Sequence, residues 1–164
     1  MLNNVHAAGF HVSGWEKFPS RDVPEMFNYG HVLHYIIESL GNVMIDGYDD
    51  GTENQMKKGE RLKDSGFVNT VFDNQQGNFY YISGHVHRSM VNENHHVRVA
   101  ISVGSGHILL ANCGGCVVED LARCCHIAAL LLYLNDHVKK HGHKKLSNVP
   151  CTSLPCVWNK GMIT

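Results

Sequence analysis

The stretch that decides the fold is residues 95–103, HHVRVAISV, in which apolar and polar side chains alternate. Val97, Val99, Ile101 and Val103 take every second position. Because successive side chains of a strand point to opposite faces, this period places one face in a core and the other toward solvent. The stretch therefore predicts an antiparallel strand with one buried face.

Three neighbouring segments share this strand character: FVNTVFD (67–73), NFYYISGHVH (78–87) and GSGHILLAN (104–112). Each combines turn residues with aromatic or β-branched ones. Over residues 121–138, LARCCHIAALLLYLNDHV, the apolar spacing becomes helical. The order β-β-β-β-α predicts an α+β fold, a small antiparallel sheet with one main C-terminal helix.

The N-terminal part has a different character. Residues 1–30 contain scattered aromatic residues and prolines without a sustained period. Residues 31–40, HVLHYIIESL, have apolar side chains at helical spacing, and residues 41–66 are rich in Gly, Asp and Asn. These patterns predict an extended arm, one short helix and a loop. We therefore expect an N-terminal arm at 1–64, a main domain at 65–145 and an irregular cysteine-containing tail at 146–164.

Composition excludes several classes of protein. The chain has 164 residues with a net charge of −1, and its longest apolar run, Ile127 to Leu134, has 8 residues. A bilayer crossing needs about 20, and the first residues lack a secretory pattern. We expect an intracellular protein, nuclear or cytoplasmic, without membrane contact. Residues 61–164 carry ten basic and six acidic side chains, so this half is mildly cationic.

Cysteine and histidine dominate one segment. All six cysteines lie between Cys113 and Cys156, and there are 13 histidines. A secreted disulfide framework would spread its cysteines along the chain, so clustering indicates a metal site instead. Cys113, Cys116, Cys124 and His126 fall within 14 residues, and thiolate with imidazole suits tetrahedral Zn²⁺.

The spacing of these four residues also predicts the local structure around each of them. Gly114 and Gly115 favour a tight turn between the first two cysteines. Residues 124 and 126 are about 200° apart around a helix, so they cannot share one helical face. We expect Cys124 at the entrance of the helix and His126 in its first turn.

Several other arrangements stay open. The thiols could be buried small hydrophobes, Cys113 and Cys116 could form a dithiol redox pair, and Cys125 could replace Cys124. The remaining candidates are Cys151 and Cys156 with His141 or His143 as a second zinc site, and His85 and His87 with His95 or His96 as a metal site on the strands.

The arrangement Cys113…Cys116…Cys124-x-His126, which follows a strand and runs into HIAALLLYL, resembles the SWIM-type zinc finger. GERLKDSGFV, FYYISGHVHRSM, RVAISVGSGHILLANC and CTSLPCVWN are similar to SWIM-containing animal and mobile-element proteins. In several of these, a YqaJ-like viral recombinase nuclease follows the finger. That nuclease would need a Glu-x-Lys element, which the chain lacks, so we do not expect an enzyme.

The resemblance implies a strand–strand–helix core around one structural Zn²⁺, in a module that binds DNA or a protein partner and has no small-molecule substrate. The basic run after the helix supplies the candidate DNA contacts, Lys139, Lys140, Lys144 and Lys145. Such lysines contact phosphates in a salt-sensitive way. They equally suit a solvated helix C-terminus, which favours cations.

Overall fold

A computed structural model describes residues 12–38, 53–87, 93–114 and 123–145. Five antiparallel strands form one sheet in the order β1-β2-β3-β4-β5. Their bounds are Glu16–Lys17, Val68–Gln76, Phe79–His87, Asn94–Ser102 and Ile108–Cys113. The helical segments are α2 (Tyr29–Leu33), a π-helical turn η1 (His34–Glu38), α3 (Glu53–Asp64) and α4 (Cys125–His141).

These elements confirm the predicted α+β class and the antiparallel sheet followed by a C-terminal helix. Strands β2 to β5 match the four predicted strands. The short β1, which pairs with β2 at Asp73 and Phe72, was not predicted. Two residues are too few to show a period.

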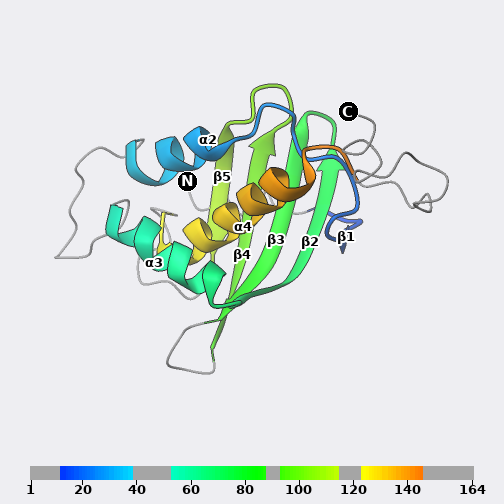
Figure 1. Cartoon of the computed structure of the whole chain (residues 1–164). Helices are drawn as coiled ribbons and strands as arrows, with labels where there is room; N and C mark the ends of the chain where they lie inside the picture. Colours follow the sequence, from blue (N-terminus) through cyan, green and yellow to red (C-terminus); the bar gives the residue numbers. More distant parts are fainter. Residues whose placement is uncertain (1–11, 39–52, 88–92, 115–122, 146–164) are drawn as a thin grey trace, which may run out of the picture.

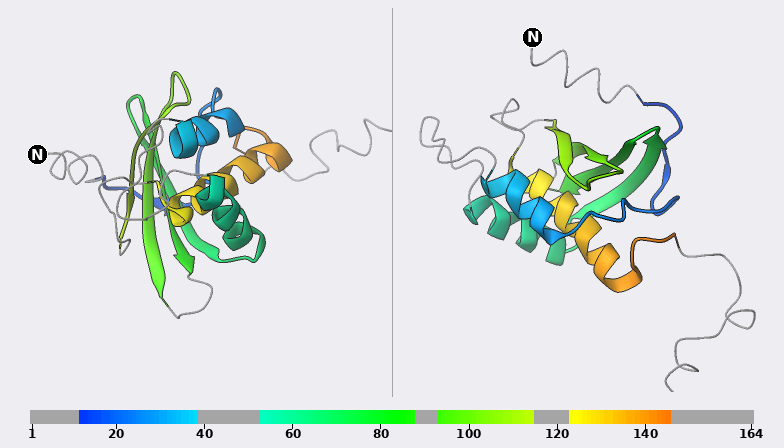
Figure 2. Two further views of the ribbon diagram at one scale, coloured as in Figure 1. Left: turned by 90° about the vertical axis from the view of Figure 1, so that its left-hand side faces the viewer. Right: turned by 90° about the horizontal axis from the view of Figure 1, so that it is seen from above.

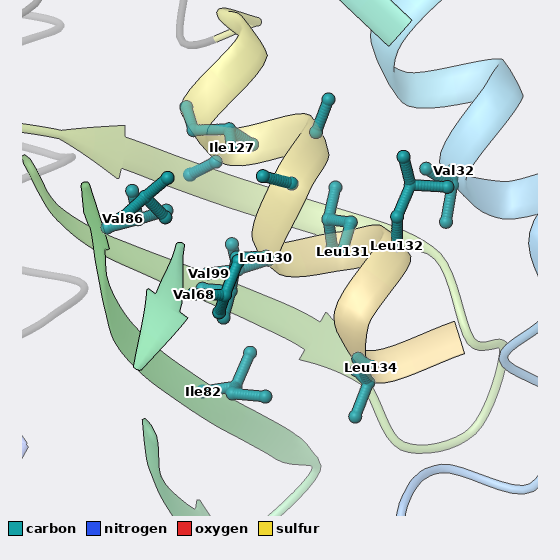
Figure 3. Close-up of a cluster of buried hydrophobic side chains, with 14 of the residues drawn as sticks. Val32, Val68, Ile82, Val86, Val99, Ile127, Leu130, Leu131, Leu132 and Leu134 are labelled. Carbon is teal, nitrogen blue, oxygen red and sulfur yellow. The ribbon is translucent and has the colours of Figure 1, made fainter. Parts of the chain in front are cut away.

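The helices lie on one face of the sheet, with α4 running across it and α2 and α3 on either side of α4 (Figures 1 and 2). Leu130 in the middle of α4 is fully buried against the sheet, near Val99 of β4 (Figure 3). Opposite it, a Cβ on Gly84 of β3 would come within 2.9 Å of Leu130 Cδ1. The missing side chain of Gly84 thus lets the helix approach the strand closely.

The expected loop at 41–66 is wrong over residues 53–64, which form helix α3. Residues 41–52 lie outside the described residues. Gln55, Met56, Gly59 and Leu62 are the buried positions of α3, and they recur at helical spacing. The Gly and the many charges of this segment obscured that period.

Helix α3 contacts α4 at Gly59, where an added Cβ would lie 2.7 Å from Ala128 Cβ and 2.9 Å from Cys125 O. Side chains of α3, of residues 18–36 and of the sheet share one hydrophobic cluster. Residues on both sides of the predicted domain boundary at residue 64 thus pack together. The boundary itself stays a prediction. No helix among the described residues is long and apolar enough to cross a membrane.

The buried carboxylate of Asp73 holds the N-terminal segment against β2. It accepts hydrogen bonds from Ser20 Oγ and, at 3.0 Å, from Tyr80 Oη, and Arg21 Nε lies 3.9 Å away. Burial nevertheless raises the pKa of Asp73 above its ordinary value. These contacts join residues 18–21 to the face of the sheet that α4 covers.

We predict that Gly59→Val destabilises the protein by about 1–3 kcal/mol, because the added side chain would overpack the contact with α4. Lys58→Val is the matched control, since Lys58 is exposed on the same helix. Urea unfolding followed by circular dichroism measures both variants. Equal stabilities of the two variants would show that the contact at Gly59 is not tight.

Candidate metal centre

Three possible metal ligands from three elements converge at one end of the sheet. His95 is the second residue of β4, Cys113 is the last residue of β5, and His126 is the second residue of α4. One ligand atom from each lies within 4.8 Å of the other two. This convergence makes the group a candidate metal centre.

The strand register explains why the first two meet. Cys113 pairs with Val97, two residues from His95 on the same face of β4. Side chains two apart on a strand point the same way, so His95 and Cys113 both face α4. They are 6% and 1% exposed, so water does not compete freely for them.

The start of α4 brings in His126. Cys124 is the N-cap residue, with extended backbone (φ −83°, ψ 171°). The expectation of Cys124 at the helix entrance and His126 in the first turn is thus confirmed. Arg123 fixes this entrance, since its Nε donates to Tyr35 O at 3.2 Å and its guanidinium lies 4.2 Å from the centre of the Tyr35 ring.

The spacing of Cys113 and His126 suits a tetrahedral ion. Cys113 Sγ lies 3.7 Å from His126 Nδ1. In a tetrahedron with Zn–S of about 2.3 Å and Zn–N of about 2.05 Å, sulfur and nitrogen are about 3.6 Å apart. The imidazoles of His95 and His126 stack with centres 3.8 Å apart and planes inclined by 12°. A metal ion lies in the plane of each imidazole that binds it, so at least one of these two rings would have to rotate for both to bind the same ion.

The hydrogen bond of His95 indicates which of its nitrogens would bind. Nδ1 lies 3.0 Å from Gly114 O, and because a carbonyl only accepts, Nδ1 must carry the proton. Nε2 then holds a free lone pair. It is buried and has no hydrogen-bond partner among the described residues. Metal-binding histidines commonly donate their other N–H to a carbonyl in this way.

Burial lowers the pKa of His95, and the neighbouring His126 lowers it further. The hydrogen bond to Gly114 and the charges of Cys124 and Glu93 oppose this shift. The net direction favours the neutral imidazole near pH 7. Metal coordination requires that form.

The structure brings together two of the four predicted ligands, Cys113 and His126. Cys124 is buried and close enough for its charge to affect His95, but it does not belong to the three-residue group. Cys116 lies outside the described residues.

His95 was not in the predicted set, although the sequence held a signal for it. It lies in phase with Val97, Val99 and Ile101, so it belongs to the buried face. The alternative site of His85 and His87 does not include His95, because these two histidines lie on the opposite face. His96 does lie beside His85, with ring centres 4.9 Å apart, but among the described residues the group of three possible ligands is the one at His95.

The other candidate residues lie apart from the centre. Cys125 is a free, half-buried thiol, and Cys151 and Cys156 lie outside the described residues. Lys139 and Lys140 are exposed in the last turn of α4. Beyond it, Lys144 Nζ lies 3.7 Å from the Asp22 carboxylate, which also accepts a hydrogen bond from the backbone N–H of Lys145. An acidic side chain thus already neutralises part of the basic run.

Comparison with known proteins found no match for this chain among family models, curated proteins or solved structures. The inference of a metal centre therefore depends on the geometry of His95, Cys113 and His126 alone.

We predict that the protein stripped of metal loses stability as the pH falls below about 6.5, the pKa of an unfolded histidine. The lowered pKa of His95 means that the native state binds fewer protons than the unfolded state. Its stabilisation is thus present above pH 6.5 and is lost as the pH falls toward the native pKa.

Urea unfolding between pH 5 and 8 in chelator should show a shallower acid decline for His95→Gln than for the wild type. Parallel pH curves for His95→Gln and the wild type would contradict the prediction.

Proposed function

We propose that the protein is a zinc-binding module in which a single structural Zn²⁺ joins β4, β5 and the start of α4. The observation that carries this proposal is the convergence of His95, Cys113 and His126 on one buried point. A thiolate with two imidazoles suits Zn²⁺, whereas Mg²⁺ and Ca²⁺ prefer oxygen ligands.

We propose Cys124 as the fourth ligand. It is buried next to the group and precedes the helix, and its side chain makes no capping hydrogen bond. Rotation about its Cα–Cβ bond would therefore break no capping hydrogen bond. The SWIM-type set differs from this one only in having Cys116 in place of His95.

Four protein ligands would leave no coordination position for water or substrate, so we propose a structural and not a catalytic role for the ion. Its binding energy would then be folding energy. The ion would tie the helix entrance to the ends of two strands. An alternative use of Cys113 in dithiol exchange would compete directly with metal binding for the same sulfur.

The resemblance to SWIM-type fingers supports a binding module, with DNA or a protein as partner. The cationic balance of residues 61–164 favours an anionic partner. A protein partner remains the second candidate, supported by the near-neutral net charge of −1 for the whole chain.

The proposal predicts about one zinc ion per full-length chain purified without chelator, measured by plasma mass spectrometry. His95→Ala and His126→Ala should each retain much less zinc and melt at lower temperature, because each removes a ligand. His96→Ala is the matched control, since His96 neighbours His95 but faces away from the centre. Zinc well below one ion per wild-type chain would refute the proposal.

Cobalt substitution distinguishes the two ligand sets. Cobalt–thiolate charge-transfer absorption grows with the number of bound sulfurs, and the set with His95 has two thiolates whereas the SWIM-type set has three. We expect two-thiolate intensity that is unchanged in Cys116→Ser and altered in Cys124→Ser. Three-thiolate intensity, lost in part in Cys116→Ser, would instead select the SWIM-type set.

A further inference from the structure

The face of the sheet opposite the helices carries a second group of functional side chains. Figure 2 shows that none of the described helices covers this face. The strand register aligns one row of residues directly across it: Lys17, Phe72, Ser83, Arg98 and Asn112. We call this side of the sheet the open face.

Aromatic rings are available on the open face. Phe79 is 45% exposed, and Trp15 and Phe72 are half-buried. Trp15 stands edge-on to Tyr81, with ring centres 6.4 Å apart. Tyr81 and Ala100 form the base of a small apolar cluster, against which Trp15 packs. Trp15 is thus held in place while part of its surface stays accessible.

Cationic and polar groups surround a hollow beside these rings. The hollow has a volume of about 320 Å³, and its walls are Trp15, Phe72, Ser83, His85, His96 and Arg98. This volume is at the small end of the range for ligand pockets, about 300–1,000 Å³. The hollow thus combines two flat aromatic rings, a guanidinium and a stacked pair of imidazoles.

Among the described residues that the register assigns to the open face, none is acidic. Glu16 pairs with Asp73, so it points to the side of the sheet that the helices cover. Glu93 precedes β4 in phase with His95, which also faces the helices. Fixed positive charge beside flat rings is complementary to a partner that carries both anionic groups and accessible planar rings.

We propose that the open face binds single-stranded nucleic acid, with bases stacked on Trp15 and Phe79 and the backbone phosphates near Lys17 and Arg98. Aromatic platforms flanked by cations recognise single strands in this way, because every base has a face to stack. A duplex keeps its bases stacked inside, so it would offer only its phosphates. An acidic peptide would satisfy the charges but not the rings.

This inference goes beyond the proposed metal centre and does not depend on it. His95 points toward α4, whereas His96 points to the open face, so the two sites lie on opposite sides of β4. The open face is also distinct from the basic run after α4. Zinc content and nucleic-acid binding can therefore fail separately.

The test is fluorescence anisotropy of a labelled oligodeoxythymidine of about 16 nucleotides, the upper end of common site sizes, with the full-length protein at low salt. Trp15→Ala should weaken binding by about 5- to 100-fold through lost stacking. Arg98→Gln should weaken binding and reduce the salt slope by about 0.7, the value for one phosphate contact with a single strand. Circular dichroism and zinc content verify that each variant is folded.

The matched control is the double variant Lys57→Ala/Lys58→Ala, which removes two exposed cations of α3 away from the open face and should bind like the wild type. Unlabelled duplex of the same length and polyglutamate should compete poorly. The proposal is overturned by no binding at low salt, by wild-type binding in folded Trp15→Ala, or by loss confined to the lysine double variant. Equal competition by duplex or polyglutamate would also overturn it, because charge alone would then explain binding.

Discussion

The structure depends on the packing of helix α4 across one face of the sheet. The buried side of α4 includes Ile127, Leu130, Leu131 and Leu134, and Gly84 of β3 removes the side chain that would hold the helix away. Burying such side chains contributes about 1.5–3 kcal/mol each, so this contact is the main source of fixed geometry. It also determines where the helix begins, and hence that His126 lies over Cys113.

Much of this arrangement could be predicted from local patterns. Alternation and turn residues located β2 to β5, and the apolar spacing of HIAALLLYL located α4, because one face of each element is buried in a regular period. Helix α3 could not be found this way. Its buried side includes the polar Gln55 and also Gly59, whose burial depends on the close approach of α4 and not on hydrophobicity.

The metal centre shows the same division between local and tertiary information. The pair Cys113 and His126 could be found because a strand end and a helix start are local features with clear sequence signals. The third residue, His95, comes from a strand that is paired with β5, so its position depends on strand register. Alternation alone separates it from His96, and this one-residue step assigns the two histidines to different faces with different surroundings.

Strands β2 to β4 each pair with the strand that follows in sequence, and this order affects how the centre assembles. Pairing between sequence neighbours closes short loops, which costs little conformational entropy and favours fast folding. All three converging residues also belong to one stretch, 95–126. A nascent chain that has emerged from the ribosome as far as α4 therefore already contains all three of them.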